Sequence, residues 1–191
     1  MANAKGSVIV GPVKFLRKRK DQAREVLPQE LLSYLADEVR LSSWYPEKHF
    51  EGLVRAVAKL MPMPLAEAIE AIGAAGAHEH ADVYGDLLRT LESSSSLFAL
   101  WGAQHDSGEL RGTTETPTRA RVSLVGFDSP SETNCLLASG YIRGGLAANG
   151  FEDIAIEKLH CMVRGDSLCE WRVTWKNPDA TPVTPGPRRT R

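Results

Sequence analysis

The spacing of hydrophobic residues changes from a helical period to a strand period about halfway along the chain. Residues 31–39 and 50–61 place apolar side chains at intervals of three and four, which is typical of amphipathic helices. Further helical segments are expected over residues 65–75 and 81–91. Later apolar positions alternate with polar ones, most clearly over residues 119–127, and this alternation predicts β-strands.

Two segments depart from this division. Residues 7–16 are rich in β-branched side chains around Gly11-Pro12, which predicts an irregular edge strand. Residues 134–148 form a glycine-rich helical segment that ends at Asn149-Gly150, as a left-handed cap requires. The order predicts an α+β fold, with an N-terminal helical layer packed on a small antiparallel sheet and one helix embedded between the later strands.

The last two strands are expected to form a C-terminal hairpin. Residues 154–164 and 168–175 flank a Gly165-Asp166 turn, and each arm alternates apolar and polar side chains. This register makes Cys161 and Cys169 cross-strand neighbours on the buried face, with Cβ atoms about 5 Å apart. Such a pair is compatible with buried thiols, with a disulfide or with two thiolate ligands of a metal.

Length and composition limit the architecture. A chain of 191 residues with 42% hydrophobic residues can bury one substantial core. We expect a flexible N-terminus over residues 1–6, a single domain over 7–176 and a disordered proline-rich tail over 177–191. The net charge is −1 and no face gathers basic and aromatic residues, so nucleic-acid binding is not expected.

The chain shows no sign of a membrane or secretory segment. No run approaches the roughly 18 consecutive apolar residues of a membrane span, and the N-terminus lacks the apolar stretch of a signal peptide. We therefore expect a cytoplasmic protein without membrane contact. In that reducing compartment an odd number of cysteines, three, argues against a structural disulfide framework.

The three cysteines form the first candidate site. Cys135 opens the glycine-rich helix, where the helix dipole favours a thiolate. If it meets Cys161 and Cys169, a tetrahedral zinc site needs one further ligand. Glu157 shares the strand parity of Cys161, whereas His160 has the opposite parity. The alternative is that all three are buried thiols that pack as small apolar side chains.

A second candidate site joins the glycine-rich helix to an earlier helix end. Gly140 and Gly144 leave one helix face bare, which suits either close helix packing or a ligand against the backbone. Trp101 and His105 lie four residues apart, a spacing suited to a cavity wall or to a helix end packed on the core. The chain has no nucleophile elbow, phosphate loop, dinucleotide fingerprint or metalloprotease motif, so we do not expect an enzyme.

These residues resemble a known family. The run Gly140-Tyr141-x2-Gly144, followed by Cys161-x3-Gly165-Asp166-x2-Cys169, is similar to the C-terminal half of the 4-vinyl reductase domain, a small-molecule-binding module. The whole chain looks most like a set of paralogous myxobacterial domains of unassigned function. The resemblance implies a helix-flanked antiparallel sheet, often dimeric, in a fold group that includes vesicle-tethering subunits and haem nitric-oxide sensors. The Tyr-x-Ser-x-Arg haem signature of those sensors is absent from this sequence.

The resemblance also implies a zinc site of three cysteines and one glutamate. Cys135, Cys161 and Cys169 match its cysteine spacing. The glutamate expected three residues before the middle cysteine is replaced by Lys158, so a zinc site would need Glu157 or His160 to shift in as the fourth ligand.

Together these features predict a non-enzymatic cytoplasmic sensor. A cavity between the helical layer and the sheet would bind a small apolar or aromatic molecule, and its candidate wall residues are Trp101, His105, Tyr141 and Gly144. Signalling would pass through a partner protein or a homodimer. The alternative is a dimeric protein–protein interaction scaffold with a filled core and no ligand.

Overall fold

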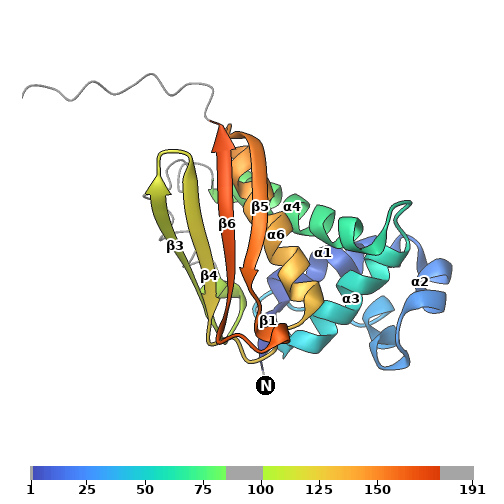
Figure 1. The fold of residues 1–191 in the computed structure, drawn as a ribbon. Helices are drawn as coiled ribbons and strands as arrows, with labels where there is room; N and C mark the ends of the chain where they lie inside the picture. Colours follow the sequence, from blue (N-terminus) through green and yellow to red (C-terminus); the bar gives the residue numbers. More distant parts are fainter. Residues whose placement is uncertain (1, 85–100, 177–191) are drawn as a thin grey trace, which may run out of the picture.

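The computed structural model describes residues 2–84 and 101–176, which form helices packed on one face of a four-stranded sheet (Figure 1). This confirms the predicted α+β class. The first half contains β1 (Asn3–Lys5), α1 (Gly6–Arg17), α2 (Lys20–Val26), η1 (Gln29–Leu35), β2 (Trp44–Pro46), α3 (Glu47–Lys59) and α4 (Leu65–Tyr84). The second half contains β3 (Glu109–Thr116), β4 (Arg119–Val125), α6 (Glu132–Ala148), β5 (Glu152–His160), η4 (Met162–Arg164) and β6 (Leu168–Lys176).

The sheet has the strand order β3-β4-β6-β5, and every neighbouring pair is antiparallel. Alternate side chains of β4 and β6, such as Val122 and Trp171, are buried. Because successive side chains of a strand point to opposite faces, this alternation makes one face of the sheet apolar. The other face carries ion pairs, such as that between Arg121 and Glu170 at 2.9 Å.

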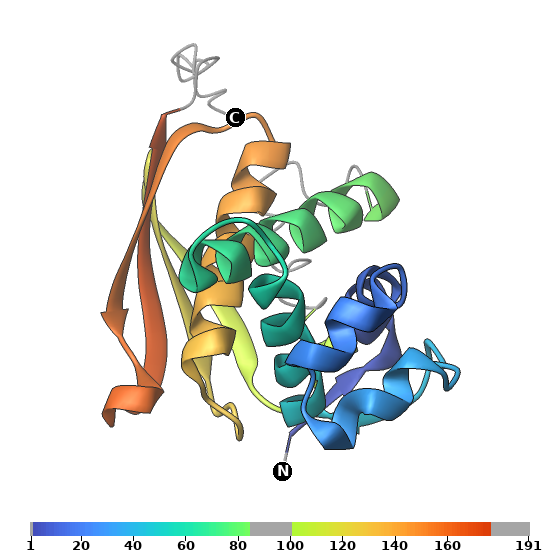
Figure 2. The same ribbon diagram turned by 90° about the vertical axis from the view of Figure 1, so that its right-hand side faces the viewer.

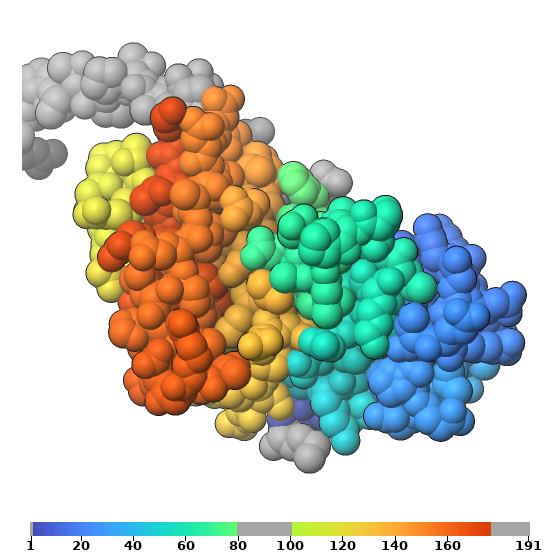
Figure 3. Space-filling view, turned by 45° about the vertical axis from the view of Figure 1, so that its right-hand side comes forward, coloured from blue at the N-terminus to red at the C-terminus, as the bar shows by residue number. Residues whose placement is uncertain are grey.

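Helix α6 covers the apolar face of the sheet, and α4 crosses α6 on the side away from the sheet (Figure 2). The space-filling view shows the sheet half, yellow to red, beside the helical half, blue to green (Figure 3). One apolar core lies between the sheet and α6, and a second joins α1, η1 and α3. A site formed by both halves must therefore lie near α4 and α6.

The predicted edge strand over residues 7–16 is wrong, because this segment lies within helix α1. Ile9, Val13 and Leu16 recur at helical spacing and are at most 1% exposed. Burial of each such side chain stabilises the fold by about 1.5–3 kcal/mol. Together they outweigh the roughly 3 kcal/mol that an interior proline costs a helix, and Pro12 is accommodated inside α1.

Other boundaries also differ from the predictions. Helix α4 runs unbroken from Leu65 to Tyr84, although a connection was expected over residues 76–80. The helix expected over residues 31–39 is the shorter 3-10 turn η1. Residues Asn3–Lys5, expected to be flexible, pair with β2. The expected helical residues 85–91 and the tail over 177–191 lie outside the described residues.

No helix within the described part of the chain combines the length and hydropathy needed to cross a membrane.

The bare face of α6 is explained by close helix packing. A Cβ atom on Gly140 would overlap the carbonyl oxygen of Glu70, and one on Gly144 would lie 2.5 Å from the carbonyl oxygen of Ala74. Both contacts are with the backbone of α4, which cannot move aside as a flexible side chain can. These two glycines therefore let the backbones of α4 and α6 come into contact where the two helices cross.

We expect Gly140→Ala to lower the free energy of unfolding by at least about 1–3 kcal/mol, because the added methyl group forces the two helix backbones apart. The matched control is Gly145→Ala in the same helix, where a Cβ atom meets nothing within 4 Å among the described residues. That control should be stabilised by up to about 1 kcal/mol through helix propensity. Urea denaturation measures both changes, and equal stabilities of the two variants would contradict the packing interpretation.

Candidate functional site

A cavity of about 340 Å³ lies where α1, α4 and α6 meet the segment around His105. Its volume is at the lower end of the range of roughly 300–1,000 Å³ that is typical of small-molecule sites. Most of its walls are apolar, and the polar side chains among the described lining residues are Ser7, Glu79, Gln104, His105, Asn134 and Tyr141. The cavity is therefore suited to a mainly apolar ligand with a few oriented polar contacts.

His105 is the most constrained polar group in the cavity wall. It is 8% exposed, and its ring stacks on Trp101 with centroids 4.1 Å apart and an interplanar angle of 20°. Trp101 is fixed in turn, because its Nε1–H donates to the carbonyl oxygen of Ser107 at 3.1 Å. The imidazole plane is thus set before any ligand binds.

The Nδ1 atom of His105 lies 3.0 Å from Oε2 of Glu47, which is 1% exposed and begins helix α3. A carboxylate can only accept, so Nδ1 carries the proton of this hydrogen bond and the lone pair of the neutral ring is on Nε2. Histidines that bind metals in proteins usually donate their other ring N–H to a carboxylate or a carbonyl in this way.

Strand β1 holds the backbone on both sides of this histidine. Ala4 forms an antiparallel bridge with His105. The Asp106 carboxylate accepts hydrogen bonds from the backbone N–H and the side-chain amide of Asn3, each at 2.6 Å. These two hydrogen bonds hold the pKa of Asp106 below its usual range. The N-terminal strand therefore fixes the backbone of His105, while Glu47 of α3 holds its ring.

Three of the four predicted ligand-binding residues line the cavity, namely Trp101, His105 and Tyr141. Gly144 is not among the lining residues, because its bare face packs on Ala74 of α4. Sequence reasoning missed the wall that α1 provides, because that segment was interpreted as a strand. It also missed Glu47, since a glutamate in the first turn of a helix gives no sign that it is buried.

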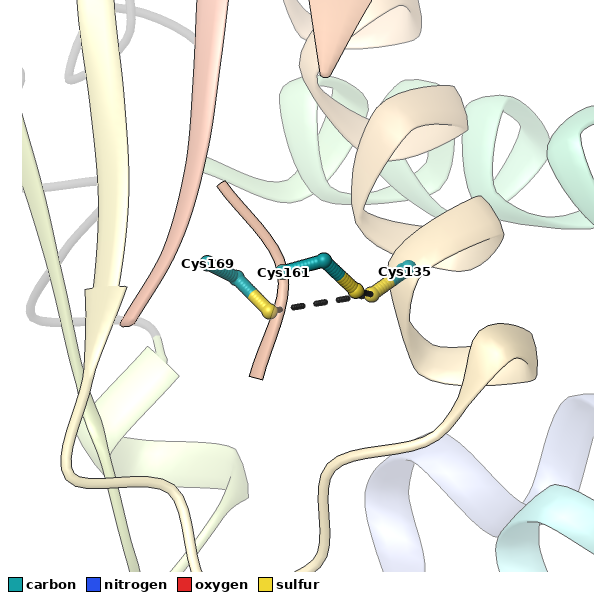
Figure 4. Close-up of side chains that lie close together, drawn as sticks. All are labelled: Cys135, Cys161 and Cys169. Atoms are coloured by element: carbon teal, nitrogen blue, oxygen red, sulfur yellow. Dashed lines mark hydrogen bonds between the residues drawn. The ribbon is translucent and has the colours of Figure 1, made fainter. Parts of the chain in front are cut away.

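The three cysteines come together at a second place, away from this cavity. Cys135 at the start of α6, Cys161 after β5 and Cys169 on β6 place their sulfur atoms within 4.8 Å of one another (Figure 4). The Sγ atom of Cys135 is 3.7 Å from each of the other two. The predicted hairpin register accounts for the approach of Cys161 to Cys169. His160 pairs with Glu170 across the hairpin, so Cys161 and Cys169, the next residue on each side, lie together.

Glu157 does not join the thiols, and its neighbour Lys158 does. The pairing of β5 with β6 shifts between Lys158 and His160, so a β-bulge reverses the side-chain parity that was used to select Glu157. Glu157 is exposed and pairs with Arg172 at 2.9 Å. Lys158 points inward, with Nζ 3.3 Å from the Sγ atom of Cys135 and 3.4 Å from the ring centroid of Trp171.

The electrostatic surroundings make Cys135 the hydrogen-bond donor and Cys169 the acceptor of the bond between them. The pKa of Cys169 is lowered to about 5, first by the hydrogen bond from the Cys135 thiol and also by the Met162 N–H and the Lys158 ammonium. The pKa of Cys135 is raised, because its proton is held by Cys169 and its burial disfavours the charged form. The pair therefore behaves as one thiol and one thiolate that share a single proton.

No family model matches the sequence, and no curated protein matches it. Solved structures do share the fold. An H-NOX protein from S. oneidensis in the Fe(II)NO state has a TM-score of 0.64 at 16% identity, covering 91% of this chain and 99% of that chain. An oxygen-binding H-NOX domain related to soluble guanylate cyclases has a TM-score of 0.63 at 14% identity, covering 91% and 96%. A structure from work on heme distortion in the H-NOX family has a TM-score of 0.62 at 14% identity, covering 91% and 96%.

These comparisons establish the fold and correct two expectations. The structures are H-NOX domains, named for binding heme, nitric oxide and oxygen, so the resemblance to the 4-vinyl reductase domain was wrong. The expectation of zinc is overturned with it, because the metal group named for these structures is haem. Among the described residues, no carboxylate or histidine joins the three thiols as a fourth ligand.

We expect Glu47→Ala to lower the free energy of unfolding by about 1–3 kcal/mol, because it leaves the buried Nδ1–H of His105 without an acceptor. Glu47→Gln keeps an acceptor oxygen and should lose less. Glu109→Ala is the matched control, since Glu109 pairs with Arg111 on the surface and solvent replaces that pair. Urea denaturation of the three variants tests this, and a Glu47→Ala variant as stable as the control would refute a structural role for the buried pair.

Proposed function

We propose that the cavity binds haem and that the domain is a haem-based sensor of a diatomic gas, with His105 as the residue that would hold the iron. The observation that supports it best is the His105–Glu47 pair at the cavity wall, within a fold shared with H-NOX domains. Haem iron is held by a proximal histidine in several protein classes. The solved structures are described as nitric oxide and oxygen complexes, which suggests the class of gas.

The residues present fit a metal cation on Nε2 of His105. Among the described residues, Oε1 of the buried Glu47 has no hydrogen-bond partner, so this carboxylate receives only the Nδ1–H of the imidazole. A buried negative charge with one donor is poorly compensated. A positive charge next to the neutral imidazole would compensate the Glu47 carboxylate. Iron bound to Nε2 would supply that charge.

The cavity walls fit the porphyrin ring less completely. Val8, Pro12 and Phe15 of α1 and Ala138 of α6 give an apolar surface on which the ring would pack. However, no lysine or arginine occurs among the described lining residues, and the Tyr-x-Ser-x-Arg signature is absent. The haem carboxylates would then rely on neutral donors or solvent. We therefore expect haem to dissociate more readily than from a site with a cationic clamp.

When bound, the haem iron would supply the coordination position at which a diatomic gas binds. The protein's own contribution is to orient the imidazole, exclude water and pass on a change in the position of His105. That change would reach α3 through Glu47, and β1 through Ala4 and Asp106. The output would be read by a partner protein or a second copy of the chain, which makes the domain a sensor and not an enzyme.

The lack of a cationic side chain in the described wall favours a second candidate. A small apolar or aromatic molecule without charged groups would bind in the same cavity and need no such clamp. His105 would then act as a hydrogen-bonding group next to the ligand, stacked on Trp101. This alternative keeps the sensor function and changes only the ligand class.

We expect purified protein mixed with ferrous haem to show a Soret band at a stoichiometry of one haem per chain. His105→Gly should lose the band and regain it when imidazole is added, because free imidazole replaces the missing ligand. His160→Gly is the matched control, since His160 is 54% exposed and is not among the described lining residues, and it should bind haem like the parent. Carbon monoxide should shift the band of the parent.

Absence of a Soret band from the folded parent protein would contradict haem binding. Thermal-shift measurements with toluene and indole then test the second candidate, because a ligand that binds only the native state raises Tm. Stabilisation should be present in the parent and absent in Val8→Trp, where a large ring occupies the cavity. Identical shifts in both proteins would exclude this cavity as the ligand site.

A further inference from the structure

The three-thiol cluster has no role in the proposed haem site. It joins three separate elements, with Cys135 in the first turn of α6, Cys161 at the end of β5 and Cys169 at the start of β6 (Figure 4). Cys161 and Cys169 are buried, whereas Cys135 is partly exposed. Cys135 is therefore the residue of the cluster that is nearest to solvent.

A lysine takes the place next to these sulfurs that a metal ligand was expected to occupy. The Lys158 ammonium lies 3.3 Å from the Sγ atom of Cys135 and is itself held over the ring of Trp171. The Met162 N–H points to the Sγ atom of Cys169 at 3.4 Å. Positive charge and N–H donors beside thiols stabilise thiolates, which are the reactive form of cysteine.

We propose that this cluster is a peroxide-reactive modification site, at which Cys135 and Cys169 become joined by a reversible disulfide. The sulfur atoms are 3.7 Å apart, and a disulfide bond is about 2.05 Å long, so they must approach by only ~1.7 Å. Both residues lie at the beginning of their elements, where such a shift disturbs few backbone hydrogen bonds.

The chemistry balances with hydrogen peroxide as the oxidant. The shared proton moves to Cys169, which leaves a Cys135 thiolate beside the Lys158 ammonium, and this thiolate attacks one peroxide oxygen, breaking the O–O bond. Cys135 becomes a sulfenic acid, and the departing hydroxide takes up a proton from solvent to form water. The Cys169 sulfur then attacks the sulfenic sulfur, the S–S bond forms, and the released hydroxide leaves as water with the Cys169 proton. One thiolate and one thiol lose two electrons in total, and with one proton from solvent one peroxide becomes two molecules of water.

Cys169 is the expected partner, although Cys161 is equally near to Cys135. The Sγ atom of Cys169 also accepts the Met162 N–H, which favours loss of the Cys169 proton as this sulfur attacks the sulfenic sulfur. The bond would tie the first turn of α6 to β6. Because Ala138 and Tyr141 of the same helix line the cavity, it would link the redox state of the chain to the ligand site.

The test uses the full chain, reduced and freed of metal with a chelator, then treated with a few equivalents of hydrogen peroxide. Peptide mapping without reductant should find Cys135 linked to Cys169, and dithiothreitol should remove the link. Lys158→Met should slow the reaction by about tenfold, because the thiolate loses its ammonium. Lys158→Arg keeps the positive charge and should react nearly as fast as the parent. Cys161→Ser should still form the link.

A parent protein that stays folded in peroxide and yields no linked peptide would overturn the proposal. So would a linkage between Cys161 and Cys169, or an equal rate in Lys158→Met and the parent. Circular dichroism of each variant shows that it is folded. The reaction needs no haem, so its failure leaves the Soret measurements on His105 unaffected, and failure of those measurements leaves this reaction unaffected.

Discussion

The buried hydrogen bond between Glu47 and His105 is the interaction on which the site depends. It connects the start of α3, in the helical half, to the chain segment that leads into the sheet. A carboxylate that is 1% exposed is stable only if a partner compensates its charge. The pair therefore fixes where the two halves meet, which nitrogen of the imidazole is protonated and which nitrogen is left for a ligand. The cavity, the proposed haem and the route to a partner all follow from that arrangement.

A second constraint is the close crossing of α4 and α6. Gly140 and Gly144 lower the helix propensity of α6, but because they lack side chains the backbones of the two helices come into direct contact. This contact places Ala138 and Tyr141 at the cavity and Cys135 beside Cys161 and Cys169. Helix α6 therefore contributes residues to both candidate sites. A chemical change at the thiols would thus be transmitted through α6 to the ligand cavity.

The sequence pattern predicted the parts of the fold that depend on local periodicity. The alternation from Arg119 to Phe127 and the Gly165-Asp166 turn led to the sheet and to the hairpin that brings Cys161 and Cys169 together. The sequence pattern failed where contacts between residues far apart in the sequence determine the local structure. Burial of Ile9 and Val13 makes a helix of a segment that contains Pro12, and a bulge in β5 turns Lys158 inward instead of Glu157. The burial of Glu47 arises only from its contact with a residue 58 positions away, which no local pattern indicates.

The protonation of the His105 ring is the most direct measure of the proposed site. Long-range nitrogen–proton NMR of the ligand-free protein, with the ring nitrogens labelled and the His105 signal assigned by comparison with His105→Gly, distinguishes the two neutral tautomers. We expect the proton on Nδ1, bound to Glu47, and the lone pair on Nε2. A proton on Nε2 and a lone pair on Nδ1 would contradict the arrangement, because the imidazole would then have no lone pair to offer a metal in the cavity.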